Sequence, residues 1–366
     1  MKITKLETIV LRIPYTSGGS DEASAWGGRR WDTADALLVR VETDAGLVGW
    51  GEAFGYNVIP ATKAVLDEIV APLVVGRPAD AIEPLLLEAQ QKLHIFGRGG
   101  PVIYALSGLD IALWDLAGKI ANQPVHRLLG GARHSEMPCY ASLIRYGTPQ
   151  GVAANVGRAL DAGFEAVKLH EIDHGCILAA RGAAGPGIPI MLDVNCPWTL
   201  SEALRHADLL AEMTPAWLEE PVWPPEDVES LAWLRTRTRV PIAAGENAAT
   251  VTQFAQILSS RAVDVLQPSS TKCGGITTLR HVFLLAAAAN TRVVPHSFYD
   301  GPGFLAALHC AAVFQTDPLV EWRFFDLEMP PLGPDWIPRD GRIPVPQGPG
   351  LGADPDPRVI ERYRAG

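Results

Sequence analysis

The segment Ile-Met-Leu-Asp-Val-Asn at residues 190–195 is a short apolar run that leads into a carboxylate. Trp-Leu-Glu-Glu-Pro at 217–221 and Ala-Ala-Gly-Glu-Asn at 243–247 repeat this pattern, and a stretch with helical spacing separates each run from the next. Short apolar runs that alternate with helical stretches are typical of parallel strands joined by crossover helices. This part of the chain therefore predicts an α/β fold with a parallel sheet.

The same alternation runs from residue 139 to residue 322. We expect strands at Cys139–Leu143, Ala166–His170, Ile188–Val194, Ala216–Glu219, Val240–Glu246, Val263–Pro268, Arg292–His296 and Leu319–Trp322. We expect helices at Gly151–Ala162, Ser201–Met213, Asp227–Thr236, Thr250–Ser260 and Thr278–Asn290. Eight such strands favour a TIM-type (β/α) barrel. An open doubly wound sheet stays the alternative, although no glycine-rich phosphate turn follows the first strand.

An α+β unit precedes the barrel. Its expected strands, marked by alternating polarity, are Ile3–Ile13, Ala36–Glu42 and Leu47–Gly51. Its expected helices are Pro60–Leu73, Ala81–Leu93 and Gly99–Ile120. We therefore divide the chain into an α+β domain over 1–125, a barrel over 126–326, and a Pro- and Gly-rich segment over 327–366 that packs back on the first domain.

The bulk composition narrows the class of protein. A net charge of −10 argues against nucleic acid as a partner, because phosphate binding requires clustered Lys and Arg. Five cysteines lie scattered without a CxxC pair, which is typical of a reducing compartment. The N-terminal residues carry charges where a signal peptide has its apolar core, and the longest apolar run, near 283–289, is too short to span a membrane. We expect a soluble cytoplasmic protein.

Three carboxylates end neighbouring predicted strands. Asp193, Glu219 and Glu246 follow one another at spacings of 26 and 27 residues, about one strand–helix unit each time. Any one of them alone is more often a helix cap or a solvated loop residue. Three at the same level of adjacent strands repel one another unless a cation lies between them. The sequence therefore predicts a site for a hard divalent ion, Mg²⁺ first and Mn²⁺ as the alternative.

Basic side chains flank this predicted metal site on both sides. Lys168 and His170 lie two residues apart at a strand end, so that both face the same side of the strand. Lys272 and His296 follow later strands. Taken singly, Lys272 fits a surface lysine and His296 a core histidine. Together they fit removal of a proton alpha to a carboxylate, with Mg²⁺ stabilising the enediolate.

Several longer motifs carry a family resemblance. They are Gly-Trp-Gly-Glu-Ala-Phe at 49–54, Ala-Leu-Ser-Gly-Leu-Asp-Ile-Ala-Leu-Trp-Asp-Leu-Ala-Gly-Lys at 105–119 and Gln-Pro-Val-His-Arg-Leu-Leu-Gly-Gly at 123–131. With the strand-end motifs, the sequence resembles the enolase superfamily and, within it, the mandelate racemase/muconate lactonising enzymes. The resemblance implies a modified (β/α)₇β barrel with an α+β capping domain. It also implies Asp193, Glu219 and Glu246 as metal ligands, and a lid loop over about 15–30.

Two positions depart from the pattern of that family. His170 stands where the Lys-x-Lys motif has its catalytic lysine, and Ser269 stands where racemase-type members carry the Asp of a His–Asp dyad. Lys272 matches the lysine of lactonising enzymes and dipeptide epimerases. The resemblance thus implies Lys168 or His170 as the base on one face and Lys272 on the other. His296 then binds substrate or acts as an acid.

Three further residues are expected to contact the substrate. They are Asn195 of the Asp-Val-Asn motif, Trp26 of the lid, and Glu321 at the end of the last strand. A structural salt bridge is the alternative for Glu321.

The expected reaction is Mg²⁺-dependent dehydration of a β-hydroxy carboxylate, either a sugar acid or a hydroxylated imino acid such as a 3-hydroxyproline. Racemisation or epimerisation at the same carbon and cycloisomerisation are the alternatives within the family. A catalytically degenerate barrel that binds a carboxylate is the alternative of another class. The expected partners are a small carboxylate substrate and further copies of the chain in a homo-oligomer, without nucleic acid or membrane.

Overall fold

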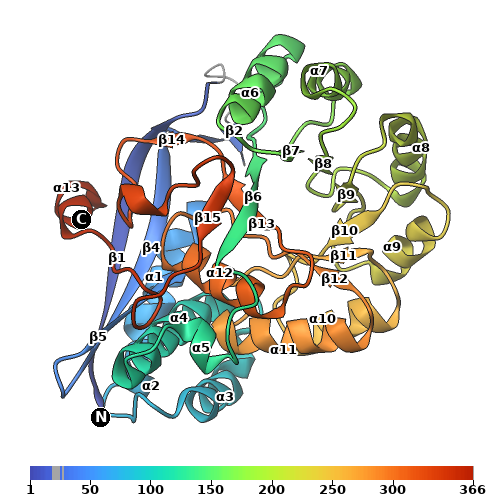
Figure 1. Ribbon diagram of the computed structural model, residues 1–366. Coiled ribbons are helices and arrows are strands. Elements are labelled where there is room, and N and C mark those ends of the chain that lie inside the picture. Colours follow the sequence, from blue (N-terminus) through green and yellow to red (C-terminus); the bar gives the residue numbers. More distant parts are fainter. Residues whose placement is uncertain (19–24, 27–28, 366) are drawn as a thin grey trace.

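The computed structural model of the protein describes residues 1–18, 25–26 and 29–365 (Figure 1). An antiparallel sheet formed mainly by N-terminal strands lies beside a curled parallel sheet. Residues 19–24 and 27–28 of the predicted lid loop lie outside the described residues. Two short strands of that loop, β2 (Ala25–Trp26) and β3 (Arg29–Arg30), pair with each other.

The antiparallel sheet has the order β14-β1-β4-β5. Its main strands are β1 (Ile3–Thr16), β4 (Thr33–Thr43) and β5 (Val48–Ala53), as the alternating pattern predicts. The alternation of β4 places Leu37 and Val39 in the large core, whereas Leu38 joins a smaller core on the other face. The helical part comprises α1 (Ile59–Ala64), a π-helical turn (Val65–Val70), α2 (Ala71–Val74), α3 (Ile82–Leu93), α4 (Pro101–Ala121) and α5 (Val125–Leu128).

Eight parallel strands form the second sheet. They are β6 (Glu136–Ser142), β7 (Val167–Leu169), β8 (Ile190–Asp193), β9 (Trp217–Glu219), β10 (Ile242–Ala244), β11 (Val265–Leu266), β12 (Arg292–Val293) and β13 (Val320–Arg323). Strands β6 to β12 pair in chain order and β13 pairs with β6, so the sheet curls round on itself. The Gln315 amide bridges β12 and the start of β13 by donating to the carbonyl oxygens of Val293 and Leu319 at 2.9 and 3.0 Å. The predicted barrel with an α+β capping domain is confirmed, and the doubly wound alternative is wrong.

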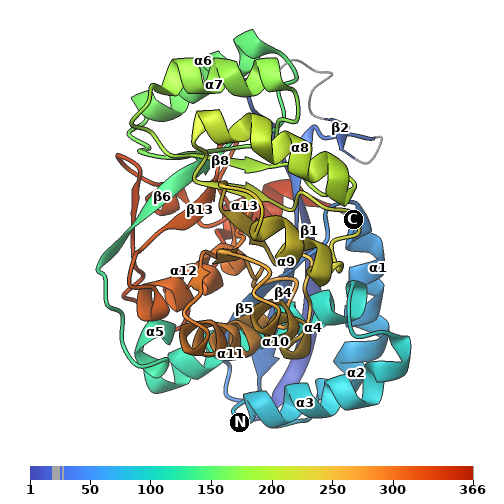
Figure 2. The same cartoon turned by 90° about the vertical axis from the view of Figure 1, so that its right-hand side faces the viewer.

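Helices cover the outside of the curled sheet (Figures 1 and 2). They are α6 (Pro149–Asp161), α7 (His174–Ala184), α8 (Leu200–Leu210), α9 (Val228–Arg235), α10 (Val251–Ser259), α11 (Gly275–Ala288) and α12 (Pro302–Phe314). The sequence prediction missed α7 and α12. Gly175 and Gly182 weaken the helical pattern of α7. Helix α12 is buried on nearly every side, so its apolar residues show no periodicity.

Helix α4 connects the antiparallel sheet with the barrel helix α11 and the C-terminal segment through two buried aspartates. Asp110 accepts a hydrogen bond from the backbone N–H of Thr277 in α11, at 3.1 Å. Asp115 accepts from the N–H groups of Trp50 in β5 and Leu351 of the C-terminal segment, at 2.9 and 2.7 Å. The motif at 105–119 therefore carries packing and hydrogen bonding rather than catalysis.

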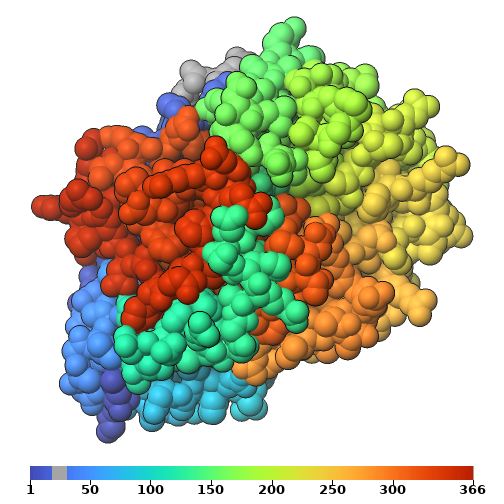
Figure 3. Space-filling model, viewed as in Figure 1, coloured from blue at the N-terminus to red at the C-terminus, as the bar shows by residue number. Residues whose placement is uncertain are grey.

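The C-terminal segment lies against both parts of the protein (Figure 3). Its elements are β14 (Asp326–Leu327), a 3-10 turn (Pro334–Trp336), β15 (Arg342–Pro344), α13 (Pro357–Tyr363) and β16 (Arg364–Ala365). Strands β14 and β16 pair with β1, whereas β15 pairs with β6 of the curled sheet. The division at residues 125 and 326 stays a prediction. Among the described residues, no helix is both long and apolar enough to cross a membrane.

Candidate active site

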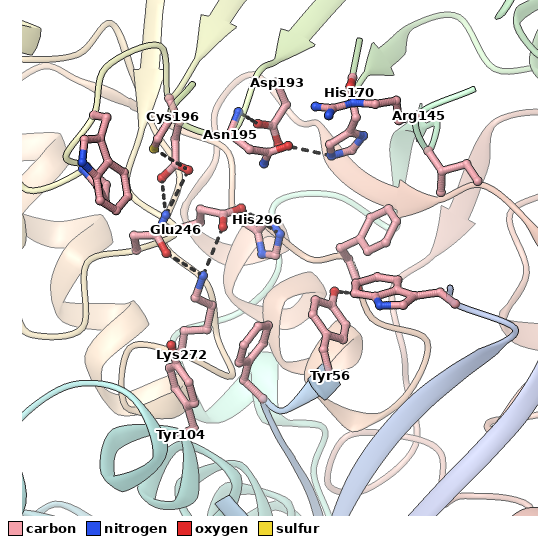
Figure 4. A pocket seen from close by; sticks show the side chains of 18 of the residues that line it. Tyr56, Tyr104, Arg145, His170, Asp193, Asn195, Cys196, Glu246, Lys272 and His296 are labelled. Atoms are coloured by element: carbon pink, nitrogen blue, oxygen red, sulfur yellow. Dashed lines mark hydrogen bonds and ion pairs between the residues drawn. The ribbon is translucent and has the colours of Figure 1, made fainter. Parts of the chain in front are cut away.

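A pocket of about 420 Å³ lies at the carboxyl ends of the parallel strands, where side chains of the N-terminal part complete its wall (Figure 4). Parallel barrels hold their chemistry at this end of the strands. The residues that line it are Tyr15, Trp31, Phe54, Tyr56, Tyr104, Ile144, Arg145, His170, Asp193, Asn195, Cys196, Glu220, Trp223, Pro225, Glu246, Asn247, Lys272, His296 and Phe298. The pocket is thus polar around the strand ends and aromatic on the side of the N-terminal part.

The three predicted metal ligands meet at this pocket. One carboxylate oxygen from each of Asp193, Glu219 and Glu246 lies within 4.8 Å of the other two. Burial and the neighbouring Asp193 charge raise the pKa of Glu219 well above its ordinary value. Despite the burial of these carboxylates, Lys168 and His170 lower the pKa of Asp193, and His296 and Lys272 lower that of Glu246. A cluster of carboxylate oxygens this close together fits a hard divalent ion such as Mg²⁺. The residues present therefore fit the predicted metal.

Lys168 lies inside the curled sheet and does not line the pocket. Its Nζ atom lies 3.3 Å from Asp193, 3.0 Å from Glu219 and 2.8 Å from Glu321. Burial would lower the pKa of Lys168, but Glu219 and Glu321 raise it well above its ordinary value. Lys168 is thus a buried ammonium ion that neutralises the carboxylates from below.

His170, one residue beyond the end of β7, does line the pocket. Its Nδ1 atom lies 2.5 Å from the carbonyl oxygen of Leu143. A carbonyl oxygen only accepts, so Nδ1 carries the hydrogen and Nε2 is the nitrogen that can gain or lose a proton. Nε2 lies 3.2 Å from Asp193 Oδ2, at the edge of the carboxylate cluster.

Lys272 and His296 approach Glu246 from the other side of the pocket (Figure 4). Lys272 Nζ lies 3.1 Å from Glu246 Oε1 and donates to Asn247 Oδ1 at 3.1 Å. Burial would lower the pKa of Lys272, but Glu246 raises it above its ordinary value, so this side chain is also an ammonium ion. His296 Nε2 lies 3.0 Å from Glu246 Oε2. Since a carboxylate accepts, this nitrogen carries a hydrogen.

The position without the family's Asp has a different partner in this chain. Ser269 lies 2.5 Å from the Tyr299 hydroxyl, Oγ to OH, and that hydroxyl lies 3.4 Å from His296 Nδ1. All three side chains are buried. A neutral serine–tyrosine pair therefore faces the His296 ring where a carboxylate would otherwise stand.

The structure separates the three predicted substrate contacts. Asn195 lines the pocket, and its side-chain oxygen is buried without a hydrogen-bond partner among the described residues. Glu321 lies beneath the pocket, where it pairs with Lys168 and accepts from the Ser297 backbone at 2.8 Å. The side chain of Trp26 lies outside what the structure describes.

Several pocket residues were missed in the sequence. Glu220 is buried beside Glu219, receives hydrogen bonds from Asn247 Nδ2 at 2.9 and 3.0 Å, and its pKa is raised by burial and by Glu246 to about 8. The sequence offered one sign of its role, because Glu220 directly follows the predicted metal ligand Glu219 in the Glu-Glu-Pro motif. The aromatic wall, with Phe54, Tyr56 and other rings from distant segments, follows no local pattern.

Two family models match most of the chain. Residues 151–359 match the model described as enolase C-terminal domain-like. Residues 28–130 match the N-terminal domain of mandelate racemase/muconate lactonizing enzyme. Together they cover the curled parallel sheet from β7 onward and most of the N-terminal part.

Individual relatives span the full chain. A D-galactarolactone cycloisomerase of Agrobacterium fabrum is 30% identical, over 100% of this chain and 99% of its own. An arabinonate dehydratase of Saccharolobus solfataricus is 29% identical, over 90% of this chain and 91% of its own. The structure of a racemase from Streptomyces coelicolor A3(2) with bound magnesium superimposes with a TM-score of 0.86 at 27% identity, over 99% of this chain and 100% of that one. The chain is therefore an enzyme of the enolase superfamily and belongs to its mandelate racemase/muconate lactonizing enzyme group.

Proposed function

We propose that the protein is a Mg²⁺-dependent dehydratase of a sugar acid, which removes the proton alpha to the carboxylate and then the hydroxyl group on the next carbon. One observation carries the proposal. His170 faces the pocket on one side, and Lys272 and His296, which carry hydrogens, face it on the other. His170 Nε2 donates to Asp193 in this structure, but with that carboxylate holding Mg²⁺ the nitrogen would be left to accept a proton. Elimination of water needs one base and one acid, whereas racemisation needs a base on each face.

His170 is proposed as the base. Its Nδ1–H is held by the Leu143 carbonyl, which leaves Nε2 to take the α-proton. Lys168, the alternative base, has its ammonium group paired with three carboxylates and away from the pocket. We therefore propose that Lys168 neutralises the negative charge of the three carboxylates and does not act as the base.

His296 is proposed as the acid that protonates the departing hydroxyl. Its Nε2–H points toward Glu246 at the pocket wall, within reach of a substrate bound over the carboxylates. The Lys272 ammonium adds positive charge beside it and can hydrogen-bond a substrate oxygen.

Asp193, Glu219 and Glu246 would hold Mg²⁺. The ion supplies positive charge that offsets the negative charge developing on the substrate carboxylate as the proton leaves. Asn195, with its unpartnered side-chain oxygen, is proposed to bind a substrate hydroxyl.

The substrate class is proposed from the relatives. These relatives are named as enzymes of sugar acids and their lactones, which favours a polyhydroxy acid over a 3-hydroxyproline as the substrate. The polar side chains along the carboxylate side of the pocket suit a ligand with many hydroxyl groups. The homo-oligomer stays a prediction.

Cycloisomerisation of a sugar-acid lactone is the second candidate. The cycloisomerase of Agrobacterium fabrum is 30% identical to this chain and aligns with it over essentially the full length of both proteins. The same base would start either reaction, because both begin with loss of the proton alpha to a carboxyl group.

Proton NMR in D₂O with Mg²⁺ tests the proposal on a panel of aldonates, aldarates and their lactones. Loss of the α-proton together with a new 3-deoxy-2-keto acid would establish dehydration. Loss of the α-proton from a lactone, with ring opening to an isomeric 3-deoxy-2-keto acid and no reaction of the open-chain acid, would establish the second candidate. Exchange of the α-proton in both epimers without elimination would overturn both, because it requires a second base. Reactions with EDTA in place of Mg²⁺ provide the control.

A further inference from the structure

A second hollow, here called the outer chamber, lies next to the active-site pocket. Its volume is about 270 Å³, and the two hollows share five lining residues, Tyr15, Trp31, Tyr56, Ile144 and Phe298. We call these five side chains the partition. Four of these five residues are aromatic, and all five border both hollows.

Hydrogen bonds and ring contacts hold the partition in place. Tyr56 donates its hydroxyl to the Phe298 carbonyl oxygen at 3.0 Å, and its ring lies 5.0 Å from the Trp31 ring. Tyr15 donates to the Trp31 carbonyl oxygen at 2.9 Å and stacks on Phe325 at 4.2 Å. Tyr56 therefore ties the N-terminal part to the loop that follows β12.

The backbone of Tyr56 is also unusual. Its φ angle is +40°, in the left-handed region that residues with a side chain rarely adopt. A non-glycine residue held there is strained and persists only where the surroundings require it. The Tyr56 ring reaches the partition from this conformation.

The far wall of the outer chamber suits a hydroxylated ligand. Its polar lining residues are Arg12, Asp32, Thr33, Asp35, Asn57 and Arg323. Asp35 pairs with Arg12 at 3.5 Å and accepts from the Thr33 hydroxyl at 2.6 Å, so these three form a fixed polar surface. Arg323 is buried, pairs with Asp300, and lies 4.5 Å from the Phe325 ring. Polar groups next to aromatic faces match a sugar, which presents both hydroxyl groups and C–H surfaces. None of the candidate metal ligands or the base lines this chamber, so it faces the end of a substrate away from the carboxylate.

We propose that Tyr56 sets the length of the acid that the enzyme accepts, by closing the active-site pocket off from a chamber that fits one further sugar unit. The proposal rests on the proposed function, because it takes the substrate to be a sugar acid. Replacement of Tyr56 by alanine removes the ring from the partition and joins the two hollows. The variant should then accept an acid that carries a glycosyl group on its terminal carbon.

Binding in the presence of Mg²⁺ tests the proposal without turnover. Isothermal titration calorimetry would compare D-gluconate with melibionate, which is gluconate with a galactosyl group on O6. The ratio of the two association constants should rise at least tenfold from wild type to Y56A. Y56F keeps the ring and should keep the wild-type ratio. Y104A is the matched control, since Tyr104 lines the active-site pocket but not the outer chamber, and it should not raise the ratio.

Two results would overturn the proposal. One is an unchanged ratio in Y56A with its fold confirmed by circular dichroism, which would mean that the outer chamber takes no ligand. The other is a wild-type enzyme that already binds melibionate as tightly as gluconate, which would mean that the partition excludes nothing. Failure of the proposed function is recognised separately, because the binding ratio can shift even where neither acid is dehydrated.

Discussion

Lys168 lies 2.8 Å from Glu321, Nζ to Oε1, and both side chains are fully buried beneath the candidate metal site. His170 follows two residues later in the sequence, and its side chain lines the pocket. The two basic residues of this strand end therefore have different surroundings: Lys168 balances buried negative charge, and His170 faces the pocket.

Substitutions at these two positions should separate stability from chemistry. K168M leaves three buried carboxylates without their counter-charge, so unfolding in urea should show a loss of about 3–5 kcal/mol. H170N should leave the midpoint of unfolding nearly unchanged and reduce α-proton exchange in D₂O by about 10²–10⁴-fold, the usual contribution of a general base. A K168M variant as stable as wild type, or an H170N variant that still exchanges the proton, would contradict this assignment.

Magnesium affinity should rise with pH. Burial and the Asp193 charge raise the pKa of Glu219, so the metal-free carboxyl group keeps its proton to higher pH than an ordinary glutamate. Mg²⁺ binds the carboxylate form and must displace that proton, so affinity falls as pH falls through this pKa. Calorimetry in buffers of different ionisation enthalpy should detect the released proton.

Two glutamate-to-glutamine variants test whether Glu219 is a metal ligand. E219Q should bind Mg²⁺ at least tenfold more weakly and release fewer protons on binding. E361Q removes an exposed glutamate in α13, which lines neither hollow, and should behave as wild type. Equal affinity in E219Q and wild type would remove Glu219 from the ligand set.

The sequence predicted the carboxylates because strand ends are regular. Asp193, Glu219 and Glu246 each follow a short apolar run, and parallel pairing sets Asp193 directly beside Glu219. Spacing along the chain therefore translates into position on the sheet. The fold followed from the same regularity, with the exception of α7 and α12, whose glycines and complete burial hide the helical period.

Depth and long-range contacts could not be predicted in the same way. Alternation places Lys168 and His170 on one side of the strand, but it does not determine which one is sealed beneath the neighbouring carboxylates. The partition joins Tyr15, Tyr56 and Phe298, which lie far apart in the chain and carry no shared motif. Such a wall exists only after the N-terminal part packs on the curled sheet.

Low pH should destabilise the folded protein through a buried histidine that does not line the pocket. His309 is fully buried, donates from Nε2 to the Leu351 carbonyl at 3.1 Å, and accepts from the His126 backbone at 3.2 Å. Burial lowers the pKa of His309 to about 3, against about 6.5 in the unfolded chain. Between about pH 3 and 6.5, His309 is therefore protonated in the unfolded chain but neutral in the folded protein.

The stability contributed by neutral His309 should be complete above about pH 6.5 and should fall by about 2 kcal/mol at pH 5. H309Q is the matched variant, because an amide can donate to Leu351 and accept from His126 without gaining a charge. Urea unfolding from pH 7 to pH 5 should show a smaller loss in H309Q than in wild type. The same loss in both proteins would place the acid sensitivity elsewhere, including the neighbouring His126, whose ring stacks on that of His309 at 5.5 Å.

Loss of the Tyr299 hydroxyl should impair turnover more than binding. The hydroxyl lies between Ser269 Oγ and His296 Nδ1, so it holds the ring that we propose as the acid. His296 keeps its contact with Glu246 in Y299F but loses the partner on its other nitrogen. We expect kcat to fall by about 10–100-fold, with KM changed by less than about threefold, because the ring is misaligned mainly as the hydroxyl departs.

Y363F is the matched control for this last prediction, since Tyr363 lies in α13 and lines neither hollow. It should retain wild-type kinetics. S269A should lie between the two, because it frees Tyr299 without removing it. A rise in KM with unchanged kcat in Y299F would instead assign His296 to substrate binding, and the proposed acid would have to be Lys272.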